Sequence, residues 1–114
     1  MELSQFLVLV QQEPSHIEFD QTMAIIDQNY TFTPTAFING DISNQAGENN
    51  GSCKILSFAK IHKLSKEQAL ACFGRFYRED VIKHPNNNDH LNIRNFIHYG
   101  WDGVKFDLKA LKSK

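Results

Sequence analysis

The sequence predicts a mainly α-helical α+β fold, with about five helices in one compact domain and a small two-stranded β element. Apolar residues recur at helical spacing in five segments, which Pro, Gly or Asn residues separate. β-branched and aromatic residues gather in only two short stretches, 31–38 and 104–106. The chain has 114 residues, of which 41% are hydrophobic and 22% charged, and we expect a single domain over residues 1–114.

Two helices are expected before residue 31. Residues 2–12 place their apolar side chains on one face, and Pro14 interrupts them. Ser15 and Glu18 then fit a capping box, in which a serine hydroxyl and a glutamate carboxylate satisfy the free amides of a helix start. The apolar face of this second helix consists of Phe19, Met23, Ile26 and Tyr30.

The β element is expected to join two extended segments that lie far apart in the sequence. Residues 31–38 are β-branched and aromatic, and Pro34 restricts them to an edge strand or an extended segment. The dipeptide Asn39-Gly40 closes this segment with a turn signal. Residues 104–106 form the second extended segment, which we expect to pair with 35–38.

Three more helices are expected in the second half of the chain. Ser52 is the expected cap of a short third helix. Residues 65–68 form a capping box for a fourth helix, which should continue to the residue before Pro85. Asp89 is the expected cap of a fifth helix that Gly100 ends. The expected inward-facing residues of these helices are Ile55, Phe58, Ala59, His62 or Ile61, Leu70, Phe73, Phe76 or Tyr77, Val81, Leu91, Ile93, Phe96 and Ile97.

Composition excludes several classes of protein. A formal net charge of −1, without clustered Lys and Arg, argues against nucleic-acid binding. Two cysteines are too few for a disulfide scaffold, so we expect reduced thiols. The apolar run 7–10 is far shorter than the ~20 residues that span a bilayer. We therefore expect a soluble monomer with no cofactor, no membrane segment and no nucleic-acid partner.

The polar, Asn- and Gly-rich segment 39–52 is the first candidate for a functional site. It runs into a helix start, where unpaired backbone amides can bind anions. Three residues rather than four separate Gly47 from Gly51, so the segment is not a Walker-type phosphate loop. A structural loop whose asparagines bond to their own backbone is the alternative interpretation. The candidate ligand- or partner-binding residues are Asn49, Asn50, Ser52, Lys54, Arg94 and Trp101.

Cys53 is the candidate nucleophile. A thiol in the first turn of a helix, next to Lys54, would have its thiolate favoured by the positive helix end and the ammonium group. His90 could act as a base, with Asn92 or Asp89 to orient it, as in cysteine hydrolases. The competing interpretation is that Cys53 is a half-buried packing residue at a helix start.

Two further clusters have both functional and structural interpretations. His84, Asp89 and His90 carry metal-ligating groups, but their spacing fits no zinc pattern, and we expect no metal site. Trp101, with Tyr99 and Tyr77, could line a surface that recognises a protein partner. Core packing of these rings is the alternative, because large aromatic side chains fill much of the core in a domain of this size.

Six segments together form a pattern that identifies a family. They are YTFTPTAF (30–37), NG (39–40), AGENNGSCK (46–54), FGRFYREDV (73–81), HLNIRNF (90–96) and GW (100–101). In this order they resemble the HopJ type III effector family, over nearly the whole chain. The resemblance implies a single HopJ-like domain of bacterial origin, with no catalytic residue to carry over.

The function expected from the resemblance is that of a HopJ-like protein acting through contacts with a protein partner. Its expected location is the bacterial cytoplasm, or outside the cell after type III secretion. Two alternatives stay open. One is a cysteine-dependent hydrolase centred on Cys53 and His90, and the other is a housekeeping bacterial protein that binds a small ligand in segment 39–52.

Overall fold

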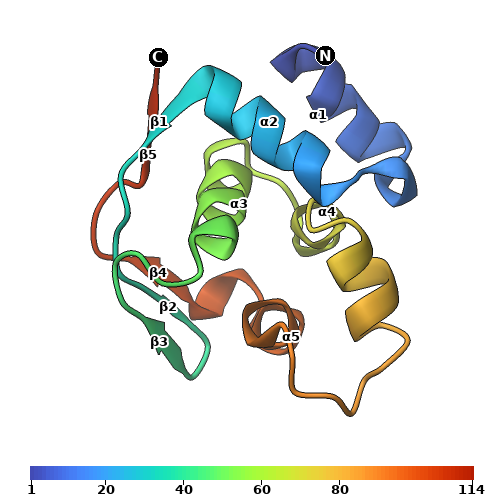
Figure 1. The fold of residues 1–114 in the computed structure, drawn as a ribbon, viewed down its shortest axis with the longest axis vertical. Helices are drawn as coiled ribbons and strands as arrows, with labels where there is room; N and C mark the ends of the chain where they lie inside the picture. The colour runs from blue at the N-terminus through green and yellow to red at the C-terminus, as the bar shows by residue number, and fades with distance from the viewer.

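Five α-helices surround a common core in the computed structural model, which describes residues 1–114 (Figure 1). The α+β fold class is therefore confirmed, although the β part is larger than expected. The helices and helical turns are α1 (Leu3–Gln12), η1 (Pro14–His16), α2 (Phe19–Asn29), α3 (Asn50–Ile61), α4 (Lys66–Ala71), η2 (Phe76–Val81), α5 (Leu91–Tyr99) and η3 (Trp101–Gly103). The strands are β1 (Tyr30–Phe32), β2 (Phe37–Asn39), β3 (Ile42–Asn44), β4 (Val104–Phe106) and β5 (Leu111–Ser113).

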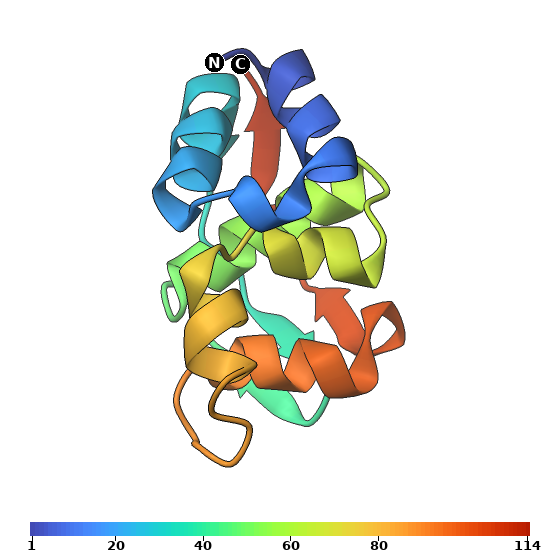
Figure 2. The same ribbon diagram turned by 90° about the vertical axis from the view of Figure 1, so that its right-hand side faces the viewer.

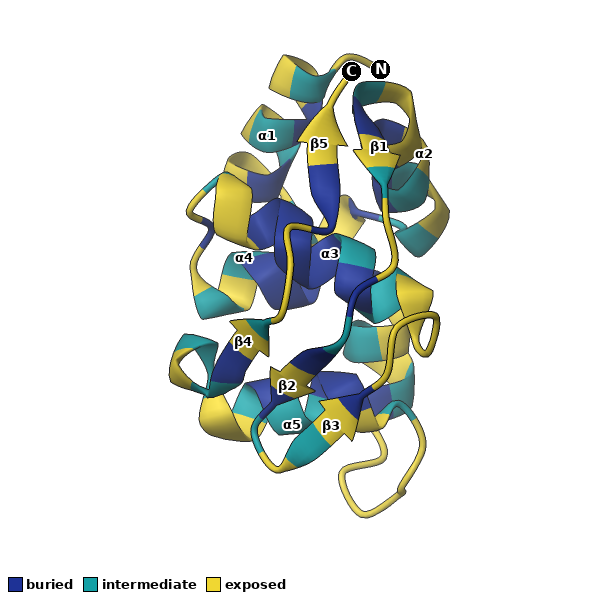
Figure 3. Ribbon diagram, turned by 90° about the vertical axis from the view of Figure 1, so that its left-hand side faces the viewer, coloured by how far each residue is buried: buried dark blue, intermediate teal, exposed yellow.

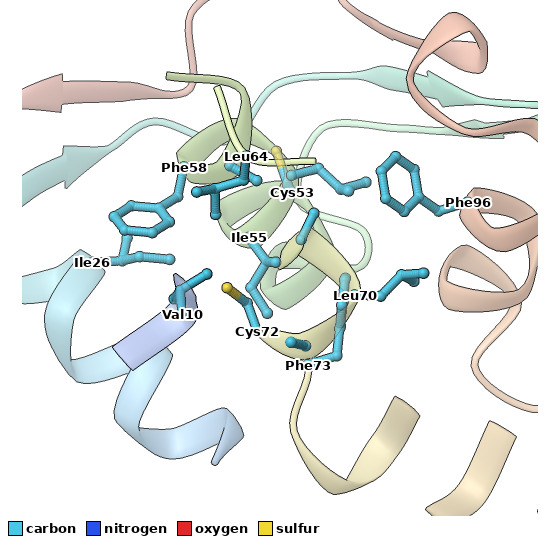
Figure 4. Packing of buried hydrophobic residues seen from close by; sticks show 14 of the residues in the cluster. Val10, Ile26, Cys53, Ile55, Phe58, Leu64, Leu70, Cys72, Phe73 and Phe96 are labelled. Atoms are coloured by element: carbon cyan, nitrogen blue, oxygen red, sulfur yellow. The ribbon is translucent and has the colours of Figure 1, made fainter. Parts of the chain in front are cut away.

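Helix α3 runs through the centre of the molecule. Residues 55–59 are buried without a break, so this part of the helix is covered on every side. Its neighbours are α2, α4 and β5, and Figure 4 shows the apolar side chains that meet around it. The largest fully buried rings of the core are Phe6, Phe37, Phe58, Phe73 and Phe96.

The strands form a long antiparallel ribbon with a third strand at one end (Figure 3). β1 pairs with β5, and β2 pairs with β4, as expected for 35–38 and 104–106. Tyr30 lies opposite Ser113 at one end of the ribbon, and Asn39 lies opposite Val104 at the other. The register is the same in both sheets, so residues 30–39 and 104–113 are one pair of strands with an interrupted middle.

Pro34 lies at this interruption. Proline has no N–H to donate, so the segment predicted as one strand is divided into β1 and β2 on either side of it. β2 is not an edge strand, because β3 pairs with its other side. Backbone and side-chain hydrogen bonds bridge the gap, from Thr33 N to Ala110 O, from Asp107 N to Ala36 O and from Leu108 N to Thr35 Oγ1.

Three predicted helix caps are wrong, each by one to three residues. Residues 14–16 form a 3₁₀ turn, and the cap of α2 is Glu18, whose capping box uses Gln21. α3 begins three residues earlier than expected, because its cap is Asn49 rather than Ser52. α5 is preceded by His90 rather than Asp89. The caps of α3 and α5 both have left-handed backbone, which sequence preferences for caps do not indicate.

The predicted fourth helix is broken in two at Gly74. α4 ends at Ala71, and the π-helical turn η2 follows the break. Gly74 has a φ of +62°, and a Cβ atom there would lie 2.5 Å from the backbone nitrogen of Phe19. The break therefore lets the chain pack closely against the start of α2, which a continuous helix would prevent.

Replacing Gly74 should destabilise the fold more than replacing Gly47, which is also left-handed (φ +92°) but has nothing within 4 Å of its Cβ position. Gly47→Ala should cost about 1–2 kcal/mol for the backbone alone. Gly74→Ala adds a backbone clash and should cost about 3 kcal/mol or more. Urea unfolding measures both, and equal losses would contradict the close approach of Gly74 to Phe19.

Candidate functional site

A cavity of about 480 Å³ opens between the N-terminal ends of α3 and α5, with η2 and the start of α2 on the other side. Figure 2 shows η2 (gold) and α5 (orange) in this part of the molecule, joined by the projecting turn 82–90. Half of the lining is apolar and consists of Phe19, Ile42, Phe73, Phe76, Leu91 and Ile93. The other half consists of Asn49, Gly51, Ser52, Asn88, His90 and Asn92.

Both helix starts at this cavity lack a capping side chain. Asn49 and His90, with φ of 53° and 50°, precede α3 and α5, and neither side chain accepts a hydrogen bond from the helix amides. The carbonyl oxygens of Asn49 and His90 already accept the first helical bonds. The free first-turn amides are those of residues 50–52 and 91–92, and such amides carry a partial positive charge.

A buried network of asparagines holds the two helix starts together. Asn92, in the first turn of α5, donates to Asn44 Oδ1 over 3.0 Å and accepts from Asn39 Nδ2 over 3.0 Å. Asn49 donates to the same Asn44 oxygen over 2.8 Å. The hairpin of β2 and β3 is thereby tied to the cap of α3 and to the first turn of α5. The exposed fractions of Asn39, Asn44 and Asn92 are 0%, 3% and 6%.

His90 belongs to a polar cluster at the edge of the cavity. Its Nε2 lies 3.0 Å from Asp80 Oδ2, and its ring stacks on Phe76 with centroids 5.0 Å apart. Asp89 Oδ2 lies 3.9 Å from the same nitrogen, while Asp89 Oδ1 accepts from Arg94 over 2.6 Å. The hydrogen bond from the Arg94 guanidinium lowers the pKa of the Asp89 carboxyl.

This cluster is the one place where a metal ion could be held. Ligand atoms of Asp80, Asp89 and His90 lie within 4.8 Å of one another, and carboxylate and imidazole groups suit several divalent cations. His84, which the sequence grouped with Asp89 and His90, is not part of the group; its carbonyl accepts from Arg94 instead. Each of the three side chains already has a partner within the protein.

Cys53 points into the core rather than into the cavity (Figure 4). Its side chain is almost fully buried, and its thiol donates to the Thr35 carbonyl over 3.9 Å. Burial raises its pKa, although the hydrogen bond with the Thr35 carbonyl and the nearby Ser57 hydroxyl partly oppose this effect. Cys53 makes no hydrogen bond to His90 or Asn92, so the structure does not assemble the hypothesised triad.

Three other candidate residues have structural partners. Lys54 pairs with Asp27 over 2.9 Å, away from the cavity. Arg94 donates to the carbonyl oxygens of Asp89, His84 and Asp80 and so shapes the turn before α5. Trp101 donates from Nε1 to the Leu64 carbonyl over 3.0 Å and packs edge-on against Phe96.

The remaining candidate residues divide between cavity and solvent. Asn49 and Ser52 line the cavity, and Asn50 is exposed. Tyr99 is 42% exposed, and Tyr77 is half-buried. Sequence reasoning missed Phe19 and Phe76 as cavity walls and Asp80 as the partner of His90. No local signal marks these residues, because their roles arise only when α2, η2 and α5 come together.

Both native thiols should react slowly with a disulfide reagent such as Ellman's reagent. Cys53 and Cys72 are buried, and burial raises the pKa of Cys72 to about 12. Because the thiolate is the reactive form, the native protein should react at least ~100-fold more slowly than the urea-unfolded protein. An added surface thiol, Ser15→Cys, is the positive control. Fast reaction of Cys53 in the folded protein would restore the nucleophile hypothesis.

Comparison with known proteins places the chain in one family. Residues 3–111 match the family described as HopJ type III effector protein. The crystal structure of VPA0580, a protein of unknown function, is 59% identical; the match covers 100% of this chain and 95% of that one, with a TM-score of 0.99. No curated protein matches, and none of the helices has the length and apolar character to cross a membrane. The chain therefore belongs to the HopJ type III effector protein family.

Proposed function

We propose that this HopJ-family protein acts by binding rather than by catalysis, and that the cavity holds a small-molecule ligand. The main observation in support of this proposal is the place of the cavity-lining residues in the sequence. Most lining residues come from segments 46–54, 73–81 and 90–96, which are three of the segments by which the chain resembles its family. These segments are distant in the sequence, and they converge at the cavity.

The lining indicates the chemistry of the ligand. The rings of Phe19, Phe73 and Phe76 offer an apolar surface. The free amides of the two helix starts, together with the Ser52 hydroxyl and His90, offer hydrogen-bond donors beside these rings. A volume of about 480 Å³ lies within the usual range of small-ligand sites. A compact molecule with a flat apolar body and one hydrogen-bond-accepting end fits this lining.

Binding is better supported than cysteine-dependent hydrolysis. A nucleophilic cysteine needs a lowered pKa and a base within hydrogen-bond reach. Cys53 has a raised pKa, its thiol donates to the Thr35 carbonyl, and no histidine is among its hydrogen-bond partners. The histidine at the cavity, His90, is paired with Asp80 instead.

Benzoate is a suitable probe, because it has a flat ring and a carboxylate end. In a ¹H–¹⁵N NMR titration to about 10 mM benzoate, the largest shifts should occur at the amides of Gly51, Ser52, Leu91 and Asn92. Benzamide, the uncharged analogue, should bind more weakly. Ser52→Leu should abolish the shifts by filling the cavity, whereas Ser15→Leu, on the exposed surface, should not. Absent or scattered shifts would contradict the proposed ligand chemistry.

We also propose that the protein leaves the bacterial cytoplasm through a type III system and contacts a host protein as a monomer. The family description supports export, and exposed apolar side chains support a protein contact. The exposed apolar residues include Val8, Ile38, Ile61, Phe76, Ile82, Leu91 and Leu108. Phe76 and Leu91 also line the cavity, whereas the other five lie outside it, so ligand binding and the protein contact are tested separately.

Export is tested with the whole chain fused to an adenylate cyclase reporter that is active only inside host cells. Cyclic AMP should rise in host cells exposed to a strain with a working type III system. It should stay at background with an isogenic strain that lacks the export ATPase. Equal signals from the two strains, or none from either at normal expression, would contradict export.

A further inference from the structure

We propose that a second groove, between α3 and residues 106–111, docks an acidic, extended segment of a protein partner that inserts one apolar side chain. This inference rests on the proposal that the protein acts through protein contacts, and it is independent of the cavity ligand. The groove has a volume of about 450 Å³ and shares no lining residue with the cavity. Its lining residues come from the second half of α3 and from the segment that joins β4 to β5, which Figure 3 shows beside β1 and β2.

The walls of the groove are apolar and open to solvent. Ile61, near the end of α3, is 41% exposed, and Leu108 on the opposite side is 69% exposed. Phe106 lies between these walls as a half-buried ring. Large aliphatic side chains facing one another across an open groove gain free energy when an apolar side chain covers them.

The floor of the groove holds an unsatisfied hydroxyl. Ser57, in the middle of α3, lines the groove and is 7% exposed, yet its Oγ has no hydrogen-bond partner. The Cys53 thiol one turn earlier is close enough for this hydroxyl to lower its pKa, but no hydrogen bond forms between them. The Oγ itself is buried beneath the groove surface, so the apolar walls and the charges, rather than this hydroxyl, select the occupant.

The charges at the groove favour an acidic partner. Lys60 and Lys109 line it, and Lys60 Nζ lies 5.8 Å from the centroid of the Phe106 ring. The lysine salt bridges of the protein involve Lys54 and Lys83, so the groove lysines are unpaired. Asp107 is the only acidic residue in the lining. Carboxylates of a partner would complement this surface.

The backbone favours an extended segment over a small anion. β4 ends at Phe106 and β5 begins at Leu111, and each strand has a pairing partner on one side only, so free strand edges lie at both ends of the groove. An edge strand offers unpaired amides and carbonyls that an extended peptide can bind. An acidic peptide can therefore combine edge pairing, an apolar anchor between Ile61 and Leu108, and contacts with the two lysines.

The probes are fluorescein-labelled hexapeptides, Glu-Asp-X-Gly-Asp-Glu, in which X is Leu, Phe, Ala or Asn. Fluorescence anisotropy should show the Leu and Phe peptides binding at least ~10-fold more tightly than the Ala and Asn peptides. The analogue with lysines in place of the acidic residues should not bind. If no peptide binds below about 1 mM, or if X makes no difference, the proposal is overturned.

Two variants locate the site. The charge-reversal pair Lys60→Glu with Lys109→Glu should weaken the Leu peptide by at least ~10-fold, and Leu108→Ser should weaken it by a similar factor. Lys83→Glu, a matched change at an exposed lysine outside the groove, should leave binding unchanged. Unaltered affinity in both groove variants would place the peptide elsewhere and overturn the proposal.

Two independent readouts separate this proposal from the others. Benzoate shifts at the cavity should be unaffected in Leu108→Ser, because the groove and the cavity share no lining residue. Export of the reporter should be unaffected as well. If Leu108→Ser loses peptide binding but keeps normal benzoate shifts and normal export, the peptide-binding site is assigned to the groove alone. If the protein is exported but binds no acidic peptide, the effector proposal is retained and the groove proposal is rejected.

Discussion

The buried hydrogen bonds among Asn39, Asn44 and Asn92 are the interaction on which the candidate site depends. They connect three separate parts of the chain, namely strand β2, strand β3 and the first turn of α5. Asn49 extends the network to the cap of α3. Because each amide group is both donor and acceptor, shifting one element would leave several buried polar groups unpaired. The network therefore fixes the positions of the two helix starts that open onto the cavity.

Glycine complements this network at the points where backbone approaches backbone or ring. Gly40 turns the β2–β3 hairpin with a φ of +65°, directly against the ring of Tyr99. Gly74, with a φ of +62°, forms the turn between α4 and η2 and lies directly against the backbone of Phe19. With the hairpin, η2 and α5 thus held in place, Phe76 can stack on His90 and Phe19 can pack edge-on against Phe76. The cavity is a consequence of these close approaches rather than of any single loop.

Sequence patterns were sufficient where structure depends on nearby residues. The apolar spacing identified α1, α2 and the existence of α5, and β-branched residues identified the pairing of 35–38 with 104–106. They failed where a distant contact decides the conformation. The helix breaks at Gly74 because the start of α2 packs closely against it. Asn92 is buried because it hydrogen-bonds to Asn39 and Asn44. Nothing in the local sequence distinguishes these residues from an ordinary helix glycine or a solvated asparagine.

The start of α3 shows how a small difference in register changes the chemistry of a site. Successive residues of an α-helix point about 100° apart, so Ser52, Cys53 and Lys54 must face three directions. Because α3 begins at Asn50 and is held by Asn49, Ser52 faces the cavity, Cys53 faces the core and Lys54 reaches Asp27. A thiol and an ammonium adjacent in sequence are thereby separated from each other and from His90. This helix register keeps the Cys53 thiol out of the cavity, while the backbone amides in the first turn of α3 stay free to bind a ligand.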